Sequence, residues 1–308
     1  ENLYLRRQYR PDCFWDIDKR YEDNLFKKRH DRRSMIFGHV SLCTGVSDLV
    51  QTFGIKPNSV VGYSLGETAG LFALKAWPNR DEMLGKIQKS TLFTQDLAGE
   101  SRAARRHWKW PRNKPLNWVL FTIDRSMDVI RDLLEKHDYV YPLISNTSEE
   151  CVIGGERSAV EGFIHGIGCR HVPIEGVSIA HCDVLKEVEE DYRELHLQKT
   201  TVPPQIKYYS GARGHSYDVT RESAADAILS HALNGVDFPK TIKAAYEDGA
   251  RIFLEIGPGA SCSRMINHIL KGRPHVARSF CIQGQNPYSL ILRGLGQCIA
   301  EGIPVNME

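Results

Sequence analysis

The sequence predicts an α/β protein in which a core of strands and helices is interrupted by a smaller unit of short elements. Two observations predict this division. A short apolar run at 58–61 leads through a glycine-flanked serine into a helix-forming run at 68–76, which indicates a buried strand followed by a helix. Beyond a stretch with Pro111 and Pro115, the pattern changes to short alternating units, and longer helical patterns return after residue 178.

The core is expected to comprise residues 1–115 and 178–308 and to contain a parallel sheet, as in α/β-hydrolase-like proteins. A loop between residues 100 and 115 marks its first boundary. The predicted core elements are a helix at 35–53, a strand ending at 61, helices at 68–76, 80–97, 183–196, 224–233 and 239–248, and a strand at 251–256.

The smaller unit, residues 116–177, shows a strand–helix–strand pattern twice. This βαβ-βαβ order is the signature of a ferredoxin-like fold. We therefore expect a ferredoxin-like subdomain inserted into the core, with a cleft between the two parts. Its predicted elements are strands at 117–123, 139–145, 150–154 and 169–174 and helices at 126–136 and 158–166.

Composition is that of an ordinary globular protein. The 308 residues, of which 42% are hydrophobic and 25% charged, suffice for one large domain and an inserted smaller one. A formal net charge of +2 argues against general polyanion binding. No apolar run approaches the roughly 20 residues of a membrane span, and the N-terminus does not resemble a secretory signal, so a cytoplasmic location is expected.

The eight cysteines are widely scattered, and no Cys or His cluster has the spacing of a metal site. We therefore expect reduced thiols and no bound metal. Cys182 follows a histidine that is considered below, but adjacent side chains point in different directions, which argues against a thiol nucleophile there.

The hexapeptide Gly62-Tyr63-Ser64-Leu65-Gly66-Glu67 has the pattern of a nucleophile elbow, a sharp turn between a strand and a helix. Such a turn forces the serine into a sparsely populated backbone conformation, so that the residues two positions away must be nearly free of side chains, as Gly62 and Gly66 are. The helix N-terminus and the Leu65 N–H would stabilise negative charge on an attacked carbonyl oxygen. An ordinary serine on a glycine-rich turn is the alternative.

A nucleophilic serine needs a base, and His181 has the most suitable context among the twelve histidines. It lies where a strand-like run ends and the charged helical run at 186–192 begins, so it can face a serine on another turn across a cleft. A structural histidine is the alternative. The late histidines without an obvious context for a base are His215, His231, His268 and His275.

These residues resemble the malonyl-CoA:acyl-carrier-protein transacylase family, which includes the acyltransferase domains of polyketide and fatty-acid synthases. The segments that carry the resemblance are the elbow, His181 at 117 positions after Ser64, the run Phe253-Leu254-Glu255-Ile256-Gly257-Pro258-Gly259, the stretch at 144–147 with the glycine pair at 154–155, and the C-terminal run at 290–305. The Gly-Tyr-Ser form of the elbow is most similar to the domains of polyunsaturated-fatty-acid-synthase-like multienzymes.

The resemblance implies an acyltransferase that moves an acyl group from a CoA or carrier-protein thioester, through an acyl-serine, to the phosphopantetheine thiol of an acyl carrier protein. His181 would remove the Ser64 proton. The partners implied are acyl-CoA, an acyl carrier protein and neighbouring synthase domains such as ketosynthase, with no nucleic acid and no permanently bound cofactor.

Further residue roles follow from the resemblance alone. In this family a backbone carbonyl orients the histidine, and alignment of the run before the Gly-Pro-Gly block assigns that role to Asp248. Asn146 corresponds to the family's asparagine and is expected at the substrate, as are Gly62 and Gly66 of the elbow.

Two positions depart from the malonyl-transferring pattern. Those members carry an arginine 25 positions after the serine, where this chain has Lys89, and lysine offers a point charge in place of a planar fork. A helix-surface lysine is the alternative. Ala180 stands where malonyl enzymes often carry phenylalanine, which leaves a roomier pocket. We expect both residues to contact the substrate, with a non-carboxylated or longer acyl group as an alternative to malonyl.

Family members begin with a strand and a Pro-Gly-rich loop whose glutamine supplies a second oxyanion donor, and the sequence starts after that segment. We expect that the sequence is truncated, with a second chain that supplies the piece as the alternative. Loss of one such donor costs on the order of 10²–10³ in rate.

The stretch at 101–114 carries six Lys/Arg residues and two tryptophans. The hypothesis is that it docks an acidic carrier protein or the phosphate end of coenzyme A. A solvated basic loop is the alternative, and nucleic-acid binding is a weaker one because no recognised motif is present.

Two other functions remain open from the sequence. A serine hydrolase of thioesterase or lipase type would use the same elbow, although its histidine usually comes late in the chain. A non-catalytic scaffold domain of a synthase is the second, and the presence of both Ser64 and His181 weighs against it.

Overall fold

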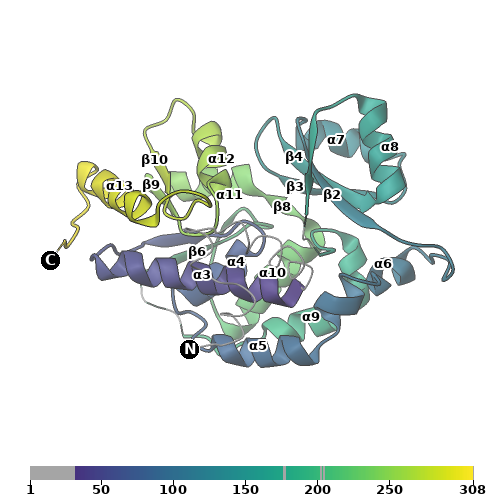
Figure 1. The fold of residues 1–308 in the computed structure, drawn as a ribbon, viewed down its shortest axis with the longest axis horizontal. Helices are drawn as coiled ribbons and strands as arrows, with labels where there is room; N and C mark the ends of the chain where they lie inside the picture. Colours follow the sequence, from purple (N-terminus) through teal and green to yellow (C-terminus); the bar gives the residue numbers. More distant parts are fainter. Residues whose placement is uncertain (1–31, 176–177, 202, 204, 308) are drawn as a thin grey trace.

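The computed structural model describes residues 32–175, 178–201, 203 and 205–307. Residues 1–31 of the predicted core lie outside these ranges. Within them, the strands form three sheets that are surrounded by helices (Figure 1). Of the described helices, none combines the length and the apolar character that crossing a bilayer needs.

The elbow is held between a long helix and a small sheet. Helix α3 (Arg32–Thr52) packs on α4 (Gly66–Ala73), and both bury apolar side chains in the main hydrophobic cluster. Strand β1 (Ser59–Val61), which leads into the elbow, pairs in parallel with β6 (Lys207–Ser210), and β6 pairs antiparallel with β7 (His215–Tyr217). Segments that are far apart in the sequence therefore fix the position of the elbow.

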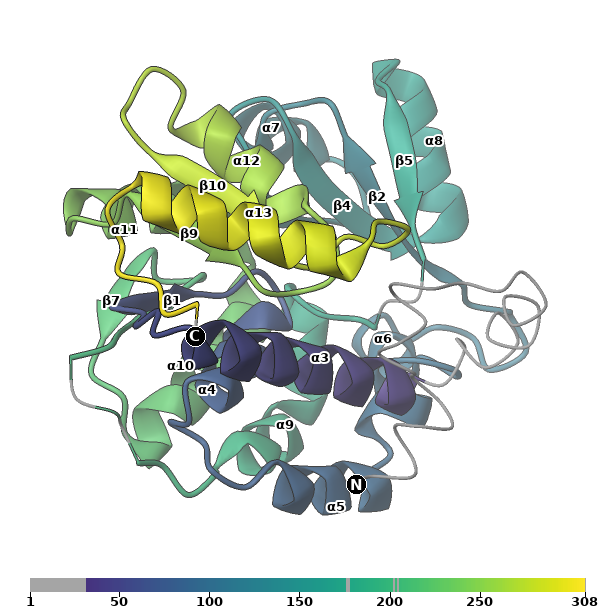
Figure 2. The ribbon, with the colours of Figure 1, turned by 60° about the vertical axis from the view of Figure 1, so that its left-hand side comes forward.

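A second, two-stranded sheet is formed near the C-terminus. Strands β9 (Ile252–Glu255) and β10 (Val276–Ser279) pair in parallel, and α12 (Ser261–Ile269) connects them. Helix α13 (Pro287–Ala300) follows. Its buried side chains share a hydrophobic cluster with those of α3, and Figure 2 shows the two helices side by side.

The smaller unit has a sheet and a hydrophobic cluster of its own. The strand order is β5–β2–β4–β3, and all neighbours in this part are antiparallel. Ile130 of α7 and Val160 of α8 are buried against Ile153 of β4, so the two helices cover one face of the sheet (Figure 1). The elements are β2 (Trp118–Ile123), α7 (Met127–Leu134), β3 (Val140–Ser145), β4 (Cys151–Glu156), α8 (Arg157–Ile167) and β5 (His171–Ile174).

The remaining helices pack on the core and position the loops between them. Helix α9 packs between α5 and α10, which fixes the loop that precedes it. The elements are α5 (Arg80–Lys89), a π-helical turn (Leu92–Asp96), α6 (Arg102–His107), a 3₁₀ helix (Asp183–Val188), α9 (Glu189–His196), α10 (Arg221–Asn234) and α11 (Phe238–Glu247).

Two predictions of local structure are wrong. The helix predicted at 80–97 ends at Lys89, because Ser90 adopts an extended conformation, and the chain resumes as the π-helical turn. The loop predicted at 100–115 contains α6, which is stabilised because Ala103 and Ala104 are fully buried.

The single parallel sheet predicted for the core is not formed by the described strands. The parallel pairs β1–β6 and β9–β10 belong to different sheets. A third short strand, β8 (Val236–Asp237), comes from the core segment and pairs in parallel with β3 of the smaller unit. Gly235 permits this approach: its φ is +82°, and a Cβ there would lie 2.8 Å from the Leu143 carbonyl oxygen.

Candidate active site

Ser64 stands on the turn between β1 and α4 with a φ of 51°, in the left-handed region that side-chain-bearing residues rarely adopt. Gly62 is required there, because an added Cβ would lie 2.0 Å from the Glu67 backbone nitrogen. The expectation that both flanking glycines must lack side chains is wrong for Gly66. That residue already begins α4, and an added Cβ would meet nothing within 4 Å.

The structure brings the predicted nucleophile and base together. Ser64 Oγ and His181 Nε2 are 2.9 Å apart, within hydrogen-bond distance. His181 also has a positive φ, 68°, and its loop is held by a hydrogen bond from the Ile179 N–H to the Leu97 carbonyl. Burial of the ring lowers the pKa of His181 below its usual value, so the imidazole is neutral near pH 7.

A backbone carbonyl of α10 orients the His181 ring. His181 Nδ1 lies 2.8 Å from the His231 carbonyl oxygen. Because a carbonyl only accepts, Nδ1 carries the proton and Nε2 presents a lone pair to Ser64. His231 lies in the last turn of α10, where helix carbonyls lack an intrahelical partner.

The prediction that Asp248 orients the histidine is wrong. Asp248 follows α11, where its carboxylate accepts a hydrogen bond from Tyr209 at 2.6 Å and lies 3.2 Å from Lys207 Nζ. These two groups hold the pKa of Asp248 below its usual value. The end of α10, and not that of α11, lies behind His181. Since any residue type carries a carbonyl, the only sequence signal for His231 is its place at a helix end.

Leu65 supplies a backbone donor beside the serine. It is the N-cap residue of α4. In the part of the chain that the structure describes, no backbone or side-chain atom accepts a hydrogen bond from its N–H. The donor is therefore available at the positive end of the helix dipole.

Asn146 links the elbow to the smaller unit and to α12. Its Oδ1 accepts a hydrogen bond from Tyr63 Oη at 2.7 Å, and its Nδ2 donates to Glu150 Oε1 at 3.0 Å. Arg264 of α12 donates to both oxygens of Glu150. Burial raises the pKa of Tyr63, so the hydroxyl keeps its proton. The structure thus places Asn146 beside the elbow with its amide engaged by protein side chains.

The two residues expected to select the acyl group make fewer contacts than Ser64 and His181. Lys89 lies in the last turn of α5 with its side chain exposed, and its ammonium group has no hydrogen bond or ion pair with another described residue. Ala180 is half-buried beside the fully buried Ile179. Contact of Lys89 and Ala180 with a substrate remains a prediction.

The tryptophans of the basic stretch take part in internal packing. The Trp108 ring stacks on Trp118 and Tyr141, and its indole N–H donates to Tyr141 Oη at 2.7 Å. Lys114 Nζ lies 4.5 Å from the centroid of the Trp110 ring. The contacts of Trp108 join the end of α6 to the smaller unit. Docking of a carrier protein on this stretch remains a prediction.

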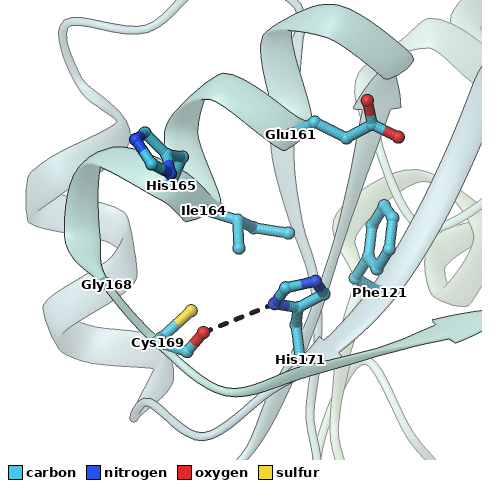
Figure 3. A pocket seen from close by; sticks show the side chains of 7 residues that line it. All are labelled: Phe121, Glu161, Ile164, His165, Gly168, Cys169 and His171. Carbon is cyan, nitrogen blue, oxygen red and sulfur yellow. Dashed lines mark hydrogen bonds between the residues drawn. The ribbon is translucent and has the colours of Figure 1, made fainter.

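A hollow of about 220 Å³ lies on the smaller unit, among β2, α8 and β5 (Figure 3). Figure 3 shows His171 beside Phe121 and hydrogen-bonded to the Cys169 carbonyl. His165 and Glu161 also line the hollow. Histidine, cysteine and glutamate are metal-ligand types, but no group of three or more such side chains among the described residues is arranged to hold a metal ion.

The chain matches the family model described as acyl transferase domain over residues 40–282, a range that contains the elbow, His181 and His231. The chain belongs to the acyl transferase domain family. The predicted resemblance to the acyltransferases of polyketide and polyunsaturated-fatty-acid synthases is thereby confirmed.

The acyltransferase domain has relatives among curated proteins and solved structures. It is 22% identical over 286 residues to a polyunsaturated fatty acid synthase component from Thraustochytrium sp., covering 87% of this chain but only 14% of that protein. The acyl transferase domain of SpnD in complex with 2-(pent-4-yn-1-yl)malonyl is similar with a TM-score of 0.72 and 18% identity, covering 97% of this chain and 68% of that one. A malonyl-transacylase in complex with a type II polyketide synthase acyl-carrier protein is similar with a TM-score of 0.66 and 18% identity, covering 87% of this chain and 82% of that one. The mixed α/β fold is therefore that of acyltransferase domains.

Proposed function

We propose that this acyltransferase domain transfers an acyl group from a CoA or carrier-protein thioester to the phosphopantetheine thiol of an acyl carrier protein, with Ser64 as the acyl acceptor. The observation that carries the proposal is the 2.9 Å distance between Ser64 Oγ and His181 Nε2 in a chain of this family. The left-handed backbone of both residues supports it, because such strained positions cluster at functional sites.

In the first half-reaction, His181 Nε2 removes the proton of Ser64 while Oγ attacks the thioester carbonyl carbon. The carbon–sulfur bond breaks, the leaving thiolate takes the proton from His181, and an acyl-serine remains. In the second half-reaction, the phosphopantetheine thiol gives its proton to His181 and attacks the acyl-serine. Ser64 Oγ recovers the proton as the new thioester leaves.

Two backbone groups assist both half-reactions. The Leu65 N–H and the N-terminus of α4 would stabilise the oxyanion of each tetrahedral intermediate. The His231 carbonyl holds His181 in the tautomer that accepts at Nε2 and stabilises the imidazolium that forms. No carboxylate is needed to complete a triad.

We assign residues 116–177 to a ferredoxin-like subdomain inserted into an α/β-hydrolase-like core of residues 1–115 and 178–308. The strand order β5–β2–β4–β3 supports the first part of this assignment, because a ferredoxin-like sheet places its fourth strand beside its first. The hydrogen bonds of Asn146 join the two parts at the elbow and support a substrate cleft there.

The acyl group is proposed to be non-carboxylated or longer than malonyl. Lys89 is exposed, and its ammonium group has no partner among the described residues, so it does not form a bidentate clamp for a carboxylate. Ala180 beside His181 is small and leaves room for a larger acyl group. The proposed partners are an acyl carrier protein and synthase domains such as ketosynthase in the cytoplasm. The similarity to a transacylase solved with its carrier protein supports the first of these.

The experiment that tests the transfer follows labelled acyl groups in the second half-reaction. The protein is incubated with labelled acetyl-, malonyl- and palmitoyl-CoA, with and without a holo acyl carrier protein, and the label is separated into carrier protein and free acid. Label on the carrier protein that depends on Ser64 supports transfer. Free acid formed at the same rate with and without the carrier indicates a hydrolase and contradicts the proposal.

A further inference from the structure

The back of the His181 ring lies against a second buried pair of titratable side chains, Glu67 and His231. Glu67 follows Ser64 by three positions on α4, and His231 supplies the carbonyl that binds His181 Nδ1. Each of the two residues is only 4% exposed. Two routes therefore connect the elbow to α10. One runs from Ser64 through the His181 ring to the His231 carbonyl, and the other runs from Glu67 to the His231 ring.

His231 lies close both to the His181 ring and to the Glu67 carboxyl. The His231 and His181 rings meet edge to face, with centroids 4.9 Å apart and an interplanar angle of 77°. His231 Nε2 lies 3.7 Å from Glu67 Oε2, and the same oxygen accepts a hydrogen bond from the Gly211 N–H at 3.1 Å. Gly211 leaves room for the ring, because an added Cβ would lie 3.0 Å from it.

Two polar atoms of the pair lack hydrogen bonds of regular geometry. Glu67 Oε1 and His231 Nε2 are buried, and among the described residues neither makes a hydrogen bond of regular geometry, although the Ser210 hydroxyl lies beside the Glu67 carboxyl. Buried polar atoms are nearly always paired, and the exceptions are often functional. The free nitrogen of His231 thus has the Glu67 carboxyl, at 3.7 Å from its Oε2, as a titratable neighbour.

Four titratable side chains lie around Glu67, and among them the charge of Arg213 favours the ionised form. They are His231 on α10, Tyr192 on α9, Tyr217 on β7 and Arg213 after β6. Burial raises the pKa of Glu67 to about 8, although the hydrogen bond from Gly211, the charge of Arg213 and the Ser210 hydroxyl each lower it. Burial also lowers the pKa of His231 well below its usual value. Both members of the pair are therefore neutral at pH 7.

We propose that Glu67 and His231 form a positioning pair that holds the His181 ring in line with Ser64 Oγ. The pair touches no reacting atom and acts through the contact between the two imidazole rings and through the His231 carbonyl. The inference rests on the proposed acyl transfer at Ser64. Loss of the Glu67 proton would place a buried charge beside His231, draw that ring toward Glu67 and release the His181 ring from its aligned position.

The test is a pH series on the whole chain with the wild type, Glu67→Gln, His231→Gln and the control His165→Gln, which removes an exposed histidine of α8. Nitrogen NMR of ¹⁵N-histidine-labelled protein reads the His181 and His231 rings without substrate. Intact-mass measurements with the reactive donors among acetyl-, malonyl- and palmitoyl-CoA read the acylation rate. Circular dichroism checks folding, and Glu67→Gln, which keeps the acceptor for Gly211, carries the test if His231→Gln does not fold.

We expect the wild-type ring signals to shift and the acylation rate to fall about tenfold or more as pH rises past about 8, because small misplacements of a reacting group cost up to roughly 10²-fold. Glu67→Gln removes both changes. His231→Gln keeps the carbonyl but loses the ring, and it lowers kcat about tenfold or more with KM unchanged. His165→Gln behaves as the wild type.

Identical ring titrations in the wild type and Glu67→Gln would overturn the positioning pair, whether or not any donor reacts. Equal acylation profiles in the two proteins would also overturn it. Ring signals that titrate as expected in a wild type that no donor acylates would instead support the pair and count against acyl transfer.

Discussion

The proposed catalytic side of the site, Ser64 and His181, and the proposed recognition side, Lys89 and Ala180, differ in how many contacts hold their side chains. Ser64 and His181 both have a left-handed backbone, and a short contact joins their side chains. By contrast, the Lys89 side chain is exposed and makes no hydrogen bond or ion pair with the described residues. Ala180 offers only a methyl group. The difference teaches that the contacts within this molecule define the type of reaction closely but define the acyl group only loosely.

The largest effect is expected from removal of the base on the catalytic side. His181→Ala should lower the rate of acylation of Ser64 by a factor on the order of 10²–10⁴, because general-base catalysis supplies about that much. Intact-mass kinetics with a saturating acyl-CoA measure it. His165→Ala, on the hollow of the smaller unit, is the matched control and should leave the rate unchanged. A rate for His181→Ala within twofold of the wild type would show that His181 is not the base.

The two glycines of the elbow provide a sharper comparison within the catalytic side. Gly62→Ala should destabilise the protein by about 3 kcal/mol or more, because its Cβ would overlap the backbone of Glu67. Gly66→Ala should be neutral or stabilising by up to about 1 kcal/mol, because it adds a good helix former in open space at the start of α4. Urea unfolding of both variants measures the difference. Equal losses would show that the turn is not held as described.

Glu67 makes the stability of the elbow region depend on pH. Its pKa in the folded protein is raised from 4.5 to about 8 by burial, so folding favours the protonated form. The wild type therefore loses stability, relative to Glu67→Gln, as pH rises from about 4.5 to about 8. The upper bound is about 1.4 kcal/mol for each pH unit. Thermal unfolding at several pH values measures the gap between the two proteins, and a gap that does not change with pH would contradict a neutral Glu67.

The smallest effect is expected on the recognition side. Lys89→Ala should change the acylation rate by less than about twofold with every acyl-CoA that reacts, because an exposed side chain without a partner contributes little. Competition between malonyl-CoA and acetyl-CoA measures any change in preference. A selective loss of malonyl transfer by an order of magnitude would show that Lys89 binds the malonyl carboxylate strongly, and the contrast between the two sides would then disappear.

Local features of the sequence predicted the elbow and the smaller unit well. The strand, the glycine-flanked serine and the helix are consecutive, and the strands and helices of the smaller unit are joined by short connections. Long-range features were beyond sequence reasoning. The orienting carbonyl of His231 is 50 positions from His181 and carries no side-chain signature. The pairing of β8 with β3 depends on a two-residue strand that has no periodicity to detect.

The most direct test of the central claim is the site of acylation itself. The wild type and Ser64→Ala are each incubated with acetyl-, malonyl- and palmitoyl-CoA, and intact mass and peptide mapping locate any adduct. The account predicts one acyl group per chain on Ser64 of the wild type with at least one donor and no adduct on the variant. An adduct that persists in Ser64→Ala, or that maps to another residue of the wild type, would contradict it.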